Sequence, residues 1–160
     1  MGARLVNTQS SINNFFNTAF SIMREEIVKG FAKLGEESVA RVRDREQVDS
    51  WIDRTGNLRS SIGYAVYDYG EKMVESAFPA VKGGTEGSAE GQKMVSELAS
   101  EYSKVYALVV VAGMNYADFV EAKENKDVLA STELWAKSVV DRRLQNAVDK
   151  ALERINKISI

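Results

Sequence analysis

Apolar residues recur every three or four positions through the first third of the chain, which predicts one face of a long amphipathic helix. The residues with this spacing are Phe16, Phe20, Met23, Ile27, Phe31 and Leu34. Ser11 is the expected N-cap, and the helix is expected to bend or break near Gly35 and continue to about Trp51. We expect this face to pack in the core, and a stripe this wide could also hold a neighbouring subunit. Residues 1–10 are polar and predict a loose tail.

The apolar pattern changes to alternation after residue 61. Residues 62–67 alternate as in a half-buried strand, residues 68–71 predict a turn, and residues 72–78 predict the returning strand. Pro79 is expected to end that strand because it cannot donate a hydrogen bond to the sheet. Residues 106–112 are apolar on both faces, which predicts a central strand. Residues 116–121 predict either its antiparallel partner or a strand passing into a helical turn.

Two further helices are expected in the second half of the chain. Residues 92–102 have a short helical pattern, and the last helix is expected to start near Ser131 or Thr132. Its apolar stripe could form an intermolecular coiled coil, although packing against the first helix and the sheet is the simpler use. The sequence therefore predicts a single α+β domain over residues 1–160, in which an antiparallel sheet of about four strands packs against a long N-terminal helix and a long C-terminal helix.

A glycine-rich segment at residues 80–91 interrupts these patterns. It lacks the Gly-Lys-Ser/Thr of a phosphate-binding loop, and Glu86 and Glu90 would repel phosphate. We therefore expect a projecting loop that contacts other proteins. The candidate interface residues are Lys82, Gly83, Gly84, Thr85, Glu86, Gly87, Ser88, Glu90 and Gly91.

Composition narrows the possible functions. The chain contains neither histidine nor cysteine, which excludes the commonest general base and thiolate chemistry. Glu121 is a single carboxylate in an apolar run and a poor catalytic candidate, so we expect no enzyme activity, no cofactor and no metal. No apolar run reaches the roughly 18 residues of a membrane span, and the start has no signal-peptide core. These features favour a cytoplasmic protein or one in a particle assembled there.

The chain changes from helical spacing to alternation at residues 54–62. Thr55 can cap a short helical turn, Gly56 suits a tight corner, and Leu58 and Ile62 are four positions apart and can point to one side. Local chemistry alone therefore predicts a corner between helix and sheet, with Leu58 and Ile62 buried.

Two short motifs carry a resemblance to a known family. The first is Thr-Gly-x-Leu-Arg-x-Ser-Ile at residues 55–62, and the second is Tyr-Ala-Asp-Phe-Val-Glu at residues 116–121, after an apolar strand that ends in Gly113. In this order, the motifs resemble the small head–tail joining and tail-completion (neck) proteins of long-tailed bacteriophages. The motif residues are Thr55, Gly56, Leu58, Arg59, Ser61, Ile62, Tyr116, Ala117, Val120 and Glu121. Family members often have a glycine soon after the glutamate, where this chain has Ala-Lys-Glu-Asn at residues 122–125.

The resemblance implies a non-enzymatic structural protein of the virion neck. Copies would form a ring around the DNA channel and join the portal or adaptor of the head to the tail terminator or tail tube. Genomic DNA would pass through without sequence recognition, and no membrane would be involved. The protein would occur in the virion and, during assembly, in the host cytoplasm, with residues 80–91 becoming ordered at an interface.

Two alternatives remain at this point. A nucleic-acid-binding regulator is suggested by arginines at 41, 43, 45, 54 and 59, although interleaved acidic residues largely cancel their charge. A metal-dependent hydrolase is suggested only by scattered aspartates and glutamates. A salt-dependent shift with DNA would favour the first alternative, and metal-dependent turnover would favour the second.

Overall fold

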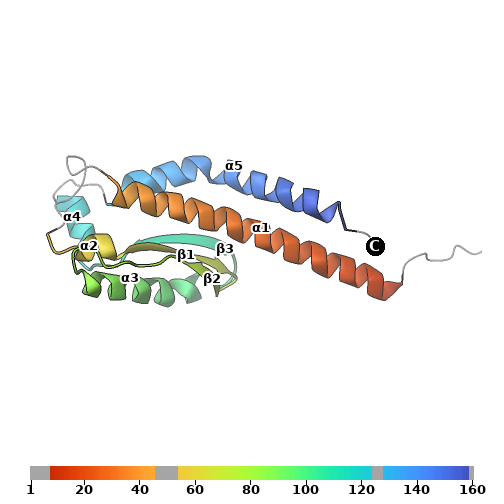
Figure 1. Ribbon diagram of the computed structural model, residues 1–160, viewed down its shortest axis with the longest axis horizontal. Helices are drawn as coiled ribbons and strands as arrows, with labels where there is room; N and C mark the ends of the chain where they lie inside the picture. Colours follow the sequence, from red (N-terminus) through yellow and green to blue (C-terminus); the bar gives the residue numbers. More distant parts are fainter. Residues whose placement is uncertain (1–7, 46–53, 124–127, 159–160) are drawn as a thin grey trace, which may run out of the picture.

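The computed structural model describes residues 8–45, 54–123 and 128–158. In chain order the elements are α1 (Gln9–Arg43), α2 (Asn57–Ser60), β1 (Ile62–Asp68), β2 (Glu71–Glu75), α3 (Thr85–Glu97), η1 (Leu98–Tyr102), β3 (Tyr106–Ala112), α4 (Ala117–Lys123) and α5 (Ala130–Ile155). Figure 1 shows α3 beneath the sheet, α1 above it, and α5 alongside α1 on the side away from the sheet. The mixed architecture with two long helices and an antiparallel sheet agrees with the prediction.

Helix α1 begins earlier and ends sooner than expected. Its N-cap is Thr8, whose Oγ1 accepts a hydrogen bond from the Ser11 backbone N–H at 3.2 Å, so residues 8–10 do not belong to a loose tail, and residues 1–7 lie outside the described part. The helix continues through Gly35, contrary to the expected break, and the ring of Tyr64 occupies the space that a side chain at Gly35 would need. It ends at Arg43, and Trp51 lies outside the described residues.

The sheet has the order β2-β1-β3, with both pairs antiparallel. The predicted turn between β1 and β2 is confirmed, and Tyr69 (φ 48°) and Gly70 (φ 88°) both have positive φ, as a tight two-residue hairpin requires. The expectation that residues 106–112 form the central strand is wrong, because β1 is the central strand. The strand β3 is apolar on both faces because each face packs in a different apolar cluster, one on either side of the sheet. The described residues form three strands where about four were expected, and residues 117–123 form α4.

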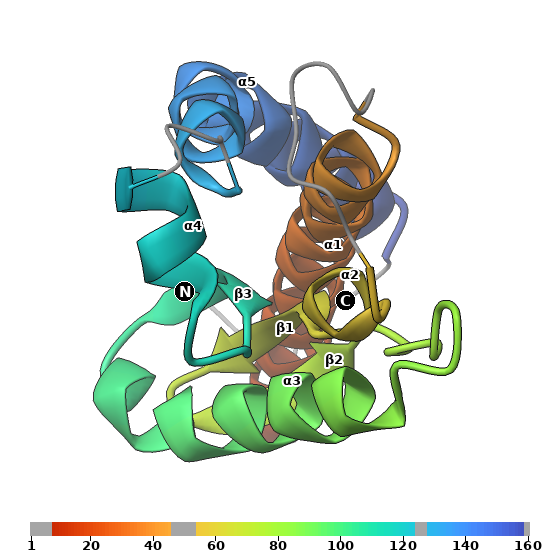
Figure 2. The same cartoon turned by 90° about the vertical axis from the view of Figure 1, so that its left-hand side faces the viewer.

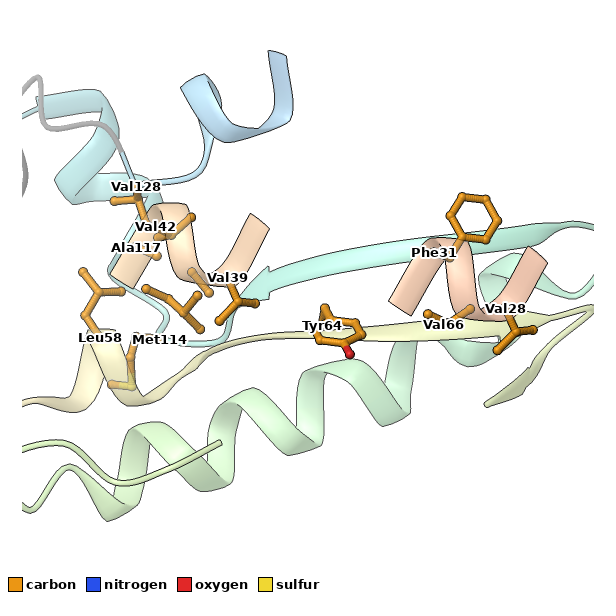
Figure 3. Packing of buried hydrophobic residues seen from close by; sticks show 12 residues of the cluster. Val28, Phe31, Val39, Val42, Leu58, Tyr64, Val66, Met114, Ala117 and Val128 are labelled. Atoms are coloured by element: carbon orange, nitrogen blue, oxygen red, sulfur yellow. The ribbon is translucent and has the colours of Figure 1, made fainter. Parts of the chain in front are cut away.

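Two apolar clusters hold the layers together. The larger one lies between α1 and the sheet and contains Val39, Val42, Leu58, Ile62 and Tyr64, among others; Figure 3 shows most of its members. The smaller one lies between the sheet and α3 and includes Tyr67 and Val95. Leu58 is 2% exposed and Ile62 is 0% exposed, which confirms their predicted burial at the corner.

Helices α1 and α5 pair along their sides. Arg154 near the end of α5 donates hydrogen bonds to Glu25 (2.8 Å) and to Glu26 of α1, and Arg143 pairs with Glu37 at 2.6 Å. At 35 and 26 residues, the two helices are about 52 Å and 39 Å long at 1.5 Å per residue. The start of α1 therefore extends past the end of α5 (Figure 1). None of the described helices is both long and apolar enough to cross a membrane.

Candidate interaction surfaces

The corner around α2 is built by its own sequence. Gly56 is the N-cap with φ 80°, a left-handed conformation that glycine adopts without steric cost. Thr55 therefore precedes the N-cap, contrary to the prediction that it caps the turn, but its Oγ1 still accepts a hydrogen bond from the Asn57 N–H at 3.3 Å. Arg59 donates to the backbone oxygen of Arg43, and Arg43 donates to that of Ile62. These contacts tie the end of α1 to the start of β1.

The first family-like motif meets, at this corner, the residues that lead into the second motif. The Gly113 N–H donates to the Ser61 carbonyl oxygen at 3.1 Å, and the Met114 N–H donates to Ser61 Oγ at 3.3 Å. Leu58 and Met114 also belong to the same apolar cluster as Ala117, and Figure 3 shows the three close together. Segments about fifty residues apart in the sequence thus form one packed unit.

The prediction of a projecting loop at residues 80–91 is wrong for most of the segment, because Thr85 begins α3. Figure 2 shows α3 running beneath α2 and the sheet. Its glycines lie against other backbone segments: a Cβ on Gly87 would lie 1.9 Å from the Asn57 carbonyl oxygen, and one on Gly91 would lie 2.6 Å from that of Ser61. The glycine-rich composition therefore permits close packing between a helix and the corner.

The candidate interface residues consequently divide into two groups. Gly84, Gly87 and Gly91 are buried, and Ser88 and Glu90 are partly buried. Lys82, Gly83, Thr85 and Glu86 are exposed at the entry to α3, where Glu86 accepts a hydrogen bond from Asn57 Nδ2 at 3.0 Å. Of the nine candidate interface residues, the exposed ones therefore lie at this entry turn.

The second motif forms the start of α4. Tyr116 is 36% exposed, Ala117 is 7% exposed, and Val120 is half-buried against the larger apolar cluster. The side chain of Glu121 lies outside what the structure describes. Hence Ala117 and Val120 contribute to the core, whereas the side chain of Tyr116 reaches the surface.

Most of the arginines at residues 41–59 contact protein. The guanidinium of Arg41 lies 4.4 Å from the ring centroid of Trp135, and Arg45 donates to the hydroxyls of Ser131 (3.0 Å) and Thr132 (3.1 Å). Burial, followed by the positive charge of Arg59, lowers the pKa of Arg43. These contacts join the C-terminal end of α1 to α5 and to the corner, which is a structural role.

A second charged cluster joins α1 to the hairpin. Arg24 donates to Asp68, which is 8% exposed, and to Glu71 at 2.7 Å. The hydrogen bonds to Asp68 and then to Glu71 raise the pKa of Arg24. The arrangement neutralises a buried carboxylate at the end of β1, and within the described residues no three acidic side chains converge as a possible metal site.

An apolar cleft of about 470 Å³ lies between α1, β3 and the first half of α5. Its lining includes Phe31 and Leu34 of α1, Leu108 and Val110 of β3, and Ala136 and Val140 of α5. The charged residues of the lining are Glu133 and Lys137, which pair with each other at 2.5 Å. The cleft thus offers a hydrophobic surface with a balanced charged rim.

An aromatic cluster lies on the part of α1 that extends past α5. Phe16 is 52% exposed and Phe20 is 70% exposed; their rings stack with centroids 6.3 Å apart, and Phe15 meets Phe16 edge-on at 5.8 Å. The expectation of core packing is correct for Phe31 and Leu34 but wrong for these earlier residues. The spacing of apolar residues predicts that all of these side chains lie on one face of α1. Which part of that face is buried depends on how far the sheet and α5 extend along the helix.

Comparisons with protein-family models, curated proteins and solved structures found no match for this chain.

Proposed function

We propose that this chain is a non-enzymatic structural protein of the head–tail interface of a long-tailed bacteriophage, where copies form a ring around the DNA channel. The observation that carries the proposal is that Ser61 of the first motif bonds to Gly113 and Met114, which lead into the second motif, and that Leu58 and Ala117 of the two motifs belong to one apolar cluster. Each short motif by itself is weak evidence for the family. Because the two motifs belong to one packed unit, they support the family resemblance more strongly as a pair. Their order along the chain resembles that of the phage neck proteins.

The exposed features also favour protein–protein assembly. Aromatic residues are enriched and charged residues are depleted at the centres of protein interfaces. The exposed phenylalanines at the start of α1 and the apolar cleft beside α5 have this character. In the proposed ring, some surfaces meet neighbouring copies and others meet the head connector or the tail terminator or tube. The protein would reside in the virion neck and, before assembly, in the host cytoplasm.

Within the described part of the chain, we find no feature that favours either alternative function. The arginines that suggested nucleic-acid binding largely contact α5 and the corner. A protein that binds DNA through phosphate contacts would lose affinity steeply as salt rises, so a gel-shift titration at two salt concentrations discriminates a regulator from a neck protein. Metal-stimulated hydrolysis of DNA or nucleotides by the purified chain would instead favour a hydrolase.

Electron microscopy of phage lysates tests the proposal directly. Without the gene, full heads and free tails should accumulate unjoined, and the wild-type gene supplied in trans should restore joined particles. Normal joining in the absence of the gene would overturn the proposal. Portal, capsid and tail-tube genes beside this gene would be an independent positive result.

The entry turn of α3 can be tested in the same complementation assay. Lys82→Glu reverses an exposed charge in that turn, and Lys104→Glu makes the same change at an exposed position on the turn after η1. If the entry turn contacts a partner, Lys82→Glu should lower the yield of joined particles and Lys104→Glu should not. Equal yields from the two variants would remove this turn from the interface.

A further inference from the structure

The start of α1 combines an exposed aromatic surface with an absence of charge. Residues 8–23 contain no Asp, Glu, Lys or Arg, although 28% of the chain is charged. Among the described residues, Arg154 near the end of α5 pairs with Glu25 and Glu26, which follow this segment in α1, and the side chains of Phe16 and Phe20 within it are exposed. An exposed apolar helix surface of this kind indicates a binding site for another protein.

The cleft has the properties needed to receive that helix. Its floor is formed by side chains of α1, β3 and α5, and its two charged rim residues neutralise each other. An uncharged helix therefore meets no unpaired charge as it enters, so the two surfaces are electrostatically compatible. Amphipathic helices commonly bind other proteins by inserting apolar side chains into a groove of this type.

The same molecule cannot make this contact with itself. Phe20 and Leu34 both belong to the continuous helix α1, and their separation of 14 positions corresponds to about 21 Å along the axis. The cleft is fixed beside Leu34, so Phe20 reaches a cleft only on another copy. We propose that the aromatic end of α1, with Phe16 and Phe20 as its anchors, docks in the cleft of a neighbouring copy of the same chain.

The contact is between two different surfaces, so it is head-to-tail. Such contacts generate closed rings when the rotation between copies closes and open filaments when it does not. This inference rests on the ring assembly proposed above and names its interface, with each copy donating one helix end and receiving another.

The expected contact between free copies is weak. Two phenylalanines bury at most about 300–500 Å², compared with roughly 800 Å² per partner in a stable complex. A copy already held on a preformed ring has a high effective concentration relative to its neighbours, which compensates for a weak contact. The small contact area thus fits subunits that remain monomeric until they bind next to one another on a preformed ring.

Cysteine cross-linking tests the contact because the natural chain has no cysteine. Purified Phe20→Cys is mixed at high concentration with a size-tagged Ala136→Cys, which places a thiol in the cleft lining, and the mixture is oxidised. Leu134→Cys is the matched control, because Leu134 lies on the same helix, is 70% exposed, and does not belong to the cleft lining. Circular dichroism and thermal melting of each reduced variant establish that it is folded.

The mixed disulfide of Phe20→Cys with Ala136→Cys should form at least tenfold faster than that with Leu134→Cys. The Phe20→Cys, Ala136→Cys double variant should yield a ladder of covalent oligomers. The proposed docking would be overturned if the mixed disulfides with Ala136→Cys and Leu134→Cys formed at equal rates. It would also be overturned if Phe20→Cys formed disulfides only with other copies of Phe20→Cys. The cross-linking uses purified protein without phage, so its failure alongside a joining defect in lysates would refute this interface and leave the neck function standing.

Discussion

Gly87 of α3 lies directly against the backbone of Asn57 in α2: its own N–H donates to Asn57 Oδ1 at 3.3 Å, and a Cβ on Gly87 would lie 1.9 Å from the Asn57 carbonyl oxygen. The contact joins a glycine from the predicted loop to the first of the two motif segments. It explains why the helix that packs closely against this corner has glycine at the point of contact.

Gly87→Ala should therefore destabilise the protein. Alanine is favoured over glycine in a helix by about 1 kcal/mol, but the clash with backbone should outweigh this gain and give a net loss of about 1–3 kcal/mol. Urea denaturation measures the free energy of unfolding. Gln92→Ala, at an exposed position on the same helix, is the control and should be neutral or slightly stabilising; a stabilised Gly87→Ala would refute the close packing.

Leu58→Ala should cost about 2–5 kcal/mol of stability, as for a large-to-small change in a core. Leu58 is 2% exposed and belongs to the cluster between α1 and the sheet. Leu134→Ala, at a side chain that is 70% exposed, should change stability by no more than about 0.5 kcal/mol. A Leu58→Ala effect below 1 kcal/mol in chemical denaturation would mean that the first motif does not contribute to the core as described.

Ser61→Ala should weaken the link between the two motif segments. Ser61 is 0% exposed, and its Oγ accepts from the Met114 N–H and donates to the Leu58 carbonyl oxygen at 2.8 Å. The substitution leaves a buried backbone N–H without this partner, at a cost of about 1–3 kcal/mol. Faster amide hydrogen exchange at Met114 would locate the effect, and Ser138→Ala on the exposed side of α5 should leave that exchange unchanged.

Glu25 links the stability of the α1–α5 pair to pH. Hydrogen bonds from Lys29 and then from Arg154 lower the pKa of Glu25 from its ordinary value of 4.5. For a lowered carboxyl pKa, the stabilisation is fully present above the unfolded-state pKa and is lost as pH falls through the folded-state pKa.

Glu25→Gln should accordingly reduce the acid dependence of stability below pH 4.5, the unperturbed value for this carboxyl. Thermal melting temperatures of the variant and the wild type should differ near neutral pH and converge as the pH falls. Glu97→Gln, at an exposed carboxylate 3.9 Å from Lys93, should follow the wild-type curve. A constant difference between Glu25→Gln and wild type across the acid range would contradict the ionic contribution.

Local patterns in the sequence identified the main elements and the buried corner. The spacing of apolar residues predicted both long helices, and alternation predicted β1 and its hairpin, because each pattern reflects the geometry of a single element. Burial of Leu58 and Ile62 followed from their separation by four residues at a change of pattern. The glycines at 83–91, by contrast, favoured a loop locally, since glycine weakens a helix in isolation.

Tertiary contacts decided the remaining features. The helical positions 87 and 91 accommodate only glycine because neighbouring atoms of the corner and of Phe78 occupy the space of a side chain, and no local pattern encodes that proximity. Phe20 and Phe31 follow the same spacing, yet Phe20 is 70% and Phe31 is 9% exposed. Periodicity specifies the face of a helix, whereas the lengths and positions of the elements packed against it determine how much of that face is covered.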